Sequence, residues 1–144
     1  MMRTLPILVL AAAIGAGCSS NSRNPLSSDP AEAAVGVVEG QTFELRPGQT
    51  ARVGTRGLVI GFRGVSRESR CPTDVQCVWQ GDAEVNVQAA INRMAWTDLT
   101  LHTGVEPRTA QFGEYKITLI GLAPHPRATE KIPAQNYVAT LKVE

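Results

Sequence analysis

The sequence predicts an all-β fold: a single antiparallel β-sandwich of about seven or eight strands over residues 41–144. From residue 41 onward, apolar and polar residues alternate with a period of two, as in strands that bury one face. No stretch beyond residue 41 keeps a helical period over three turns. Turn residues separate the alternating segments at uneven spacing, which favours a sandwich over a closed barrel.

An export leader is expected ahead of this domain. Arg3 is followed by an apolar run, then by the small residues Gly15, Ala16 and Gly17, and then by Cys18. The run is shorter than the roughly 20 residues that span a bilayer. This order resembles the lipobox of bacterial lipoproteins, whose cysteine sulfur takes a diacylglycerol and becomes the mature N-terminus. We therefore expect a lipoprotein signal peptide in residues 1–17 and lipidation at Cys18. A plain signal peptide cut before an unmodified cysteine is the alternative.

The lipid anchor would hold the protein at the bacterial cell envelope. Each buried methylene contributes about 0.8 kcal/mol, so the three acyl chains usual in such lipoproteins, palmitate among them, hold durably. Ser19 rather than aspartate follows Cys18, which in the lipoproteins it resembles favours the periplasmic face of the outer membrane. Residues 18–40 are polar, contain proline and have few large apolar groups. We expect them to form the lipidated N-terminus and a flexible tether.

Composition limits the classes of partner. The chain has 14 Lys and Arg against 13 Asp and Glu, with a net charge of +1. A nucleic-acid-binding protein normally has a basic excess or stripe, so nucleic acid is not expected as a partner. The expected partners are the membrane, through the lipid anchor, and an envelope protein. Aromatic residues are 5% of the chain, so the core must consist mainly of aliphatic side chains.

The strands follow from the alternation in chain order. Pro47-Gly48 predicts a type II turn after the first strand, and Asn92-Arg93 predicts a tight turn after the fourth. Residues 104–109 interrupt the pattern, and three prolines between 124 and 133 stiffen the excursion before the last strand. The expected strands are 42–46, 51–53, 58–65, 83–91, 96–103, 115–120 and 137–143.

The clearest strand also places Trp79. Val85, Val87 and Ala89 share one face of residues 83–91, with polar residues on the other. If the extended path continues backwards unbroken, Trp79 lies on the same side as these apolar residues. We therefore predict that Trp79 is mostly buried and packs over one end of the sandwich. A β-bulge at Gly81 would reverse this parity.

Cysteine use predicts one disulfide. With Cys18 acylated, Cys71 and Cys77 remain as a pair, and an oxidising periplasm favours their bonding. A metal–thiolate site is the alternative, but His102 and His125 are remote in sequence and zinc sites usually need four clustered ligands. We expect no metal and no cofactor.

The densest unusual stretch surrounds these cysteines. It reads Arg-Cys-Pro over residues 70–72, then Val-Gln-Cys-Val-Trp-Gln-Gly over residues 75–81, then an alternating strand. This motif resembles a family of uncharacterised small bacterial exported proteins and lipoproteins, and the resemblance covers roughly residues 41–144. It implies a single β-rich domain. That family has no established activity, so no residue inherits a catalytic role.

Two interpretations of the cysteine segment follow. As scaffold, the disulfide and Pro72 stiffen the loop, and Trp79 covers the edge of the core. As a recognition loop, its polar groups and its tryptophan would contact a partner. A solvent-facing Trp79 beside Arg70 favours recognition, and a buried one favours scaffold. The candidate recognition residues are Arg70 and Asp74 as exposed charges, Gln76 and Gln80 as hydrogen-bonding groups, and Trp79 as anchor.

No catalytic constellation stands out. Asp74, Asp82, Glu84 and Asp98 are expected to be solvated, and His102 is expected at the surface. Neither a Gly-x-Ser-x-Gly elbow nor a phosphate-binding loop is present. We therefore expect a lipid-anchored, non-enzymatic envelope protein that acts as a binding or structural module. The alternative is a periplasmic inhibitor or ligand-recognition module that acts through the Cys71–Cys77 loop.

Overall fold

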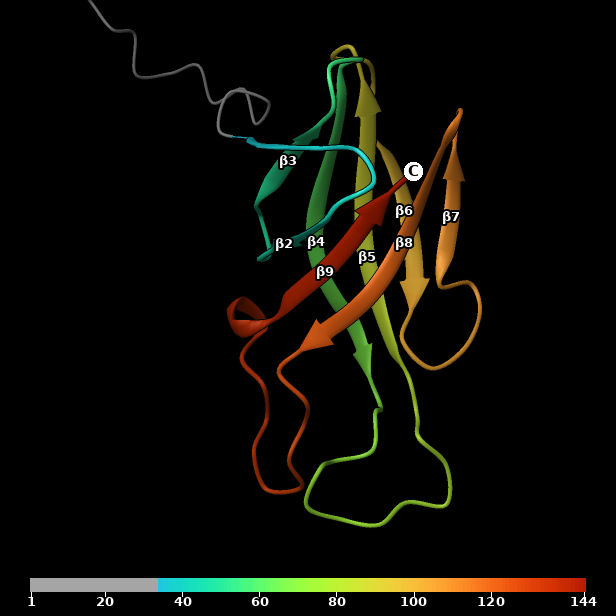
Figure 1. Cartoon of the computed structure of the whole chain (residues 1–144). Coiled ribbons are helices and arrows are strands. Elements are labelled where there is room, and N and C mark those ends of the chain that lie inside the picture. The colour runs from blue at the N-terminus through green and yellow to red at the C-terminus, as the bar shows by residue number, and fades with distance from the viewer. Residues whose placement is uncertain (1–33) are drawn as a thin grey trace, which may run out of the picture.

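The computed structural model describes residues 34–144, which form two packed β-sheets (Figure 1). The expected signal peptide, the lipidation at Cys18 and most of the expected tether lie outside these residues. The strands are β1 (Val35–Val37), β2 (Thr42–Leu45), β3 (Thr50–Val53), β4 (Leu58–Glu68), β5 (Ala83–Ile91), β6 (Thr97–His102), β7 (Thr109–Phe112), β8 (Tyr115–Ala123) and β9 (Val138–Val143). A short 3-10 helix, η1 (Ala134–Asn136), precedes β9.

The topology confirms the predicted β-sandwich. One sheet has the order β1-β3-β4-β5-β6 and the other β2-β9-β8-β7. Every strand pair is antiparallel except β1 with β3, which is parallel. Strand β1 lies within residues 18–40, which were expected to form a tether. It pairs with β3 at the edge of the five-stranded sheet, and Val37 packs against the core.

Strand β7 was not predicted either: residues 104–109 were expected to interrupt the pattern, and the next strand was expected only at residue 115. It forms a hairpin with β8 in which Phe112 lies opposite Tyr115. Gly113, with φ at +60°, allows the tight connection. Four residues are too few for alternation to distinguish this strand from the loop before it.

The core consists of the inward faces of both sheets. Val85, Val87 and Ala89 on β5 are buried, as the alternation predicted, while the residues between them are less buried. The opposite sheet contributes Leu119 from β8 and Leu141 from β9, which are paired across the strands. Aliphatic side chains dominate this core, in agreement with the low aromatic content.

Both predicted turns are confirmed. At the first, Gly48 has φ at +85° and the Gln49 amide donates to the Arg46 carbonyl at 2.9 Å, as in a type II turn. At the second, Asn92 and Arg93 both have positive φ, at +50° and +61°. The Met94 amide donates to the Ile91 carbonyl at 3.0 Å, which closes a type I′ turn.

The long strands β4 and β5 run from one end of the sandwich to the other. Their connection, residues 69–82, hangs from one end beside the β8–β9 connection, and the turn after β5 lies at the other end (Figure 1). We call residues 69–82 the disulfide loop and residues 124–133 the proline loop. Over residues 34–144 we find no helix with the length and apolarity needed to cross a membrane.

Candidate functional site

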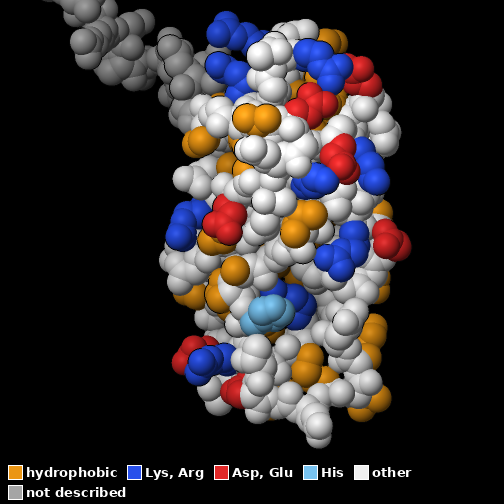
Figure 2. Space-filling model, viewed as in Figure 1, with side chains coloured by type: hydrophobic (Ala, Val, Ile, Leu, Met, Phe, Trp, Pro, Cys, Tyr) orange, Lys and Arg blue, Asp and Glu red, His pale blue; other side chains and the backbone are white. Residues whose placement is uncertain are grey.

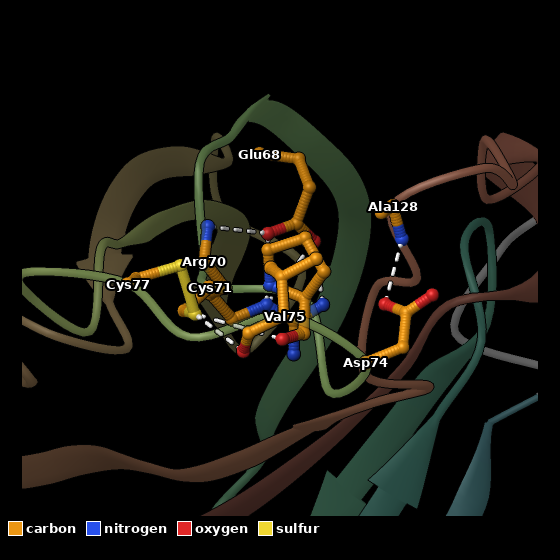
Figure 3. Close-up of a disulfide and its surroundings, with 8 residues drawn as sticks. Glu68, Arg70, Cys71, Asp74, Val75, Cys77 and Ala128 are labelled. Atoms are coloured by element: carbon orange, nitrogen blue, oxygen red, sulfur yellow. Dashed lines mark hydrogen bonds and ion pairs between the residues drawn. A yellow bond between two sulfur atoms is a disulfide. The ribbon is translucent and has the colours of Figure 1, made fainter.

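The disulfide loop contains the predicted bond between Cys71 and Cys77. The two sulfur atoms are 2.10 Å apart and the two Cα atoms 5.9 Å apart. Figure 3 shows the bond beside the side chains that hold the loop. The disulfide prediction is thus confirmed, and the bond closes a ring of short sequence separation at the end of the sandwich.

Arg70 lies at the base of this loop and is buried, not exposed as predicted. Its side chain is 7% exposed. Its Nε donates to Glu68 Oε1 at 2.9 Å, its Nη1 to the Leu122 carbonyl at 2.7 Å and its Nη2 to the Pro124 carbonyl at 2.9 Å. These acceptors satisfy the fork of the guanidinium, so Arg70 joins the loop to the end of β8 and does not face a partner.

Tyr137, the residue between η1 and β9, completes this buried cluster. Its hydroxyl donates to Glu68 Oε2 at 3.2 Å, so the carboxylate accepts from both Arg70 and Tyr137. Burial, followed by the nearby Glu68 charge and this hydrogen bond, raises the pKa of Tyr137 above its ordinary value. The phenol therefore stays neutral at physiological pH and can keep donating.

Asp74 fastens the disulfide loop to the proline loop. Its Oδ1 accepts from the Ala128 amide at 2.9 Å, and the Asp74 side chain points toward that amide in Figure 3. Nearby, the Thr73 amide donates to the Pro126 carbonyl at 3.0 Å. Asp74 is at the surface, as the recognition interpretation required, but one of its oxygens is used within the domain.

The two glutamines differ in their role. Gln80 is exposed, and its Nε2 donates to the Gly104 carbonyl at 3.3 Å, which ties the loop to the turn after β6. The backbone carbonyl of Gln80 accepts from the Cys71 amide at 2.8 Å. Gln76 lies within the disulfide ring and is exposed. Of the two glutamines, Gln76 is therefore the one that lies at the exposed end of the loop.

Trp79 faces solvent, so the prediction that it is buried was wrong. It is 70% exposed, its sequence neighbour Val78 is 106% exposed, and Val75 within the disulfide ring is 46% exposed. Hydrophobic side chains appear at the lower end of the molecule in Figure 2, where Figure 1 draws the disulfide loop. We call Val75, Val78 and Trp79 the apolar tip.

Gly81 explains why the parity failed. Its φ is +69°, a left-handed conformation that interrupts the extended path between Trp79 and β5. A Cβ at this position would lie 1.9 Å from the Ser69 carbonyl oxygen, so the two chains meet too closely for any side chain. Residues before Gly81 therefore do not continue the alternation of β5, and Trp79 leaves the apolar face.

A second polar cluster, missed by the sequence analysis, lies at the base of the loop. Asp82 and His102 were expected to be solvated, but their side chains are only 15% and 19% exposed, and Oδ2 of Asp82 is 2.6 Å from Nδ1 of His102. The other oxygen accepts from the Thr103 amide at 3.0 Å and the Gly104 amide at 2.8 Å. The sequence contained one signal for this pair: Asp82 precedes β5 and His102 ends β6, and these positions lie close together if the two strands form a hairpin.

These contacts determine the charge of Asp82. Burial alone raises its pKa, but the hydrogen bonds from Gly104, His102 and Thr103 outweigh burial and leave the pKa below its ordinary value. Asp82 therefore stays ionised and fastens the turn after β6 to the start of β5. We call this arrangement the Asp82 clamp. The groups that donate to the carboxylate of Asp82 come from the end of β6 and the turn that follows it.

The described surface has several hollows that are lined by polar residues. One of about 230 Å³ lies beside the disulfide loop and is bordered by Arg70, Gln80, Gly104 and the exposed His125. A larger one of about 410 Å³, on the five-stranded sheet, is lined by Arg63, Asn86 and Asp98 among others. Within residues 34–144, no three His, Cys, Asp or Glu side chains come together as a metal-binding group.

The disulfide loop has side chains that face outward and others that hold it in place. The apolar tip and Gln76 face outward, while Arg70 and Asp82 are used to hold the loop in place. Comparison with family models, with curated proteins and with solved structures finds no match for this chain.

Proposed function

We propose that the chain is a lipid-anchored, non-enzymatic binding module of the bacterial cell envelope, and that the apolar tip of the disulfide loop is its contact surface. The observation that carries the proposal is the exposure of two consecutive large hydrophobic residues, Val78 and Trp79, on that loop. Tryptophan is among the residues that most often supply binding energy at interfaces. As scaffold, Trp79 would have packed onto the core, and it does not.

The support beneath the tip strengthens this proposal. The disulfide closes the ring, Asp74 and Thr73 bind the proline loop, and Arg70 joins the loop base to β8. A loop held by so many contacts loses little conformational entropy when it binds, so more of its contact energy appears as affinity.

The anchoring half of the proposal rests on the leader that ends at Cys18. We propose acylation there and residence at the periplasmic face of the outer membrane. Membership of the exported bacterial family that the Arg70–Gly81 motif resembles is part of the same proposal. The disulfide supports export, because such bonds form and persist outside the reducing cytoplasm.

Site-specific photo-crosslinking in the native envelope tests the contact surface. A photoreactive residue replaces Val78, whose full exposure makes the exchange harmless to the fold, and a matched variant carries it at Met94 in the turn at the opposite end. We expect a crosslinked species from position 78 that is lost when Trp79→Ala is added, and none from position 94. Equal crosslinking from both positions, or none from position 78, overturns the proposal.

Trp79→Ala is a fair test only if the variant folds. Because Trp79 is largely exposed, we expect its melting temperature to match that of the unaltered protein. A buried aromatic would instead cost about 3–5 kcal/mol on truncation.

A further inference from the structure

We infer that the partner of the apolar tip is the lipid bilayer to which the chain is anchored, so that the disulfide loop is a second, reversible membrane contact. This inference rests on the proposed function and names the partner of the same surface. Tryptophan is enriched where membrane meets water, and aliphatic residues beside it enter the acyl region. Trp79 and Val78, adjacent and exposed, supply that pair.

The shape of the surface favours a bilayer over a protein. A stable protein interface buries roughly 800 Å² on each partner. The apolar tip consists of three side chains at the end of a loop, flanked by the exposed polar residues Gln76 and Gln80. A small projecting apolar group suits a deformable lipid surface, in which it needs no preformed pocket.

The chain outside the described residues is long enough for both contacts at once. From Cys18 to Ala34 there are 34 − 18 = 16 residue steps, or at most about 55 Å of extended chain. Val35 is in register with Ala51, which pairs with Ile60 of β4. From Ile60 to Glu68 at the loop base, β4 rises about 26 Å. The disulfide loop projects further and then returns to β5, so at most half of its length, about 24 Å, adds to this distance. The sum stays within the reach of the extended chain, so an anchor at Cys18 and the apolar tip can touch one membrane, and the anchor keeps that membrane within reach.

The charges at this end predict the kind of membrane contact. Outside the buried Arg70–Glu68 pair and the Asp82–His102 pair, the two loops carry Arg127 and Lys131 against Asp74 and Glu130, which cancel. A net-neutral surface gains little from anionic headgroups. The contact is therefore apolar, and it should be nearly the same on neutral and on anionic bilayers.

Tryptophan fluorescence tests this directly, since the chain has two tryptophans, Trp79 in the disulfide loop and Trp96 in the connection from β5 to β6. The mature lipoprotein is purified from envelopes and reconstituted into phosphatidylcholine vesicles, with and without phosphatidylglycerol. Trp96→Phe leaves Trp79 as the reporter, and Trp79→Phe leaves Trp96 as the matched control. Brominated acyl chains report contact with lipid, and iodide reports contact with water.

In the vesicles, we expect brominated lipid to quench the fluorescence of Trp79. We also expect iodide to quench it several-fold less than in a reference sample, which is the same protein in detergent-free buffer after enzymatic removal of its anchor. Trp96 should show neither effect. Val78→Asp should abolish lipid quenching of Trp79 and leave the melting temperature unchanged, because Val78 has no packing to lose. Anionic lipid should change the quenching little.

The inference is overturned if Trp79 remains open to iodide in the vesicles, or if the mature chain carries no lipid. Crosslinking from position 78 to an envelope protein, with Trp79 still in water, overturns the bilayer as partner and leaves the proposed function standing. Absence of both contacts overturns the two together.

Discussion

Gly81 approaches Ser69 so closely that a Cβ on the glycine would lie 1.9 Å from the serine carbonyl oxygen. Gly81→Ala adds this clash to a left-handed φ of +69°, so it should lower the free energy of unfolding by at least about 2 kcal/mol. Gly48→Ala is the matched control, because Gly48 also has positive φ but no atom within 4 Å of a new Cβ. Urea unfolding measures both. Equal losses would show that the contact with Ser69 adds nothing.

Arg70→Met should be among the most damaging single changes in the domain. It leaves Glu68 without its cation and the Leu122 and Pro124 carbonyls without their donor. Breaking a buried pair in this way costs about 3–5 kcal/mol. Arg67→Met is the control, since Arg67 also pairs with a carboxylate, Glu84, but is 74% exposed and should cost about 1 kcal/mol or less. Comparable losses in denaturant unfolding would contradict the buried network.

The paired substitution Cys71→Ala with Cys77→Ala should lower stability by about 2 kcal/mol, from the closure entropy of a short loop. The single variants are avoided because each leaves a reactive thiol. Non-reducing peptide mapping of protein from the periplasm should find the two cysteines linked. Two alkylatable thiols there would be the opposite result.

Acid should weaken the Asp82 clamp. Since the folded pKa of Asp82 lies below its ordinary value of 3.8, its contribution is present above that value and is lost as the pH falls through the folded pKa. At pH 7 the unaltered protein should be more stable than Asp82→Asn, and this difference should shrink below about pH 4. Urea unfolding from pH 2 to 7 measures it, with the exposed Asp98→Asn as control. A difference that persists unchanged into acid would contradict the clamp.

Cys18→Ser should release the protein from membranes or leave its leader uncut, because serine offers no sulfur for acylation. Intact-mass measurement of the mature chain and fractionation of the cells test this. A mature chain that begins elsewhere and carries no lipid would contradict the anchor.

The sandwich was predictable because its signal is local. Alternation over β5 and β8, together with the Pro47-Gly48 and Asn92-Arg93 turns, needs no knowledge of distant residues. Strand β1 was not predicted because it has only three residues, one of which is Gly36, and because they form a strand only through their pairing with β3.

The site was predictable in place but not in detail. The cysteine motif marked the right loop, and the disulfide followed from export. The burial of Arg70 depends on carbonyls at Leu122 and Pro124, more than 50 positions later, and no local pattern reports them. The exposure of Trp79 depends on one backbone angle at Gly81. The sequence indicates that a β-bulge at Gly81 would reverse the alternation, but it does not show whether the backbone takes that angle.

The fastening of the disulfide loop to the proline loop makes the two a single discontinuous unit. Residues 69–82 transplanted onto another scaffold would lose the acceptors of Arg70 and the amide that Asp74 binds, since both come from residues 122–128. The loop can be grafted, lengthened or diversified only together with its neighbour. Any library built on this domain should therefore vary the outward positions 75, 76, 78 and 79, and keep both stems fixed.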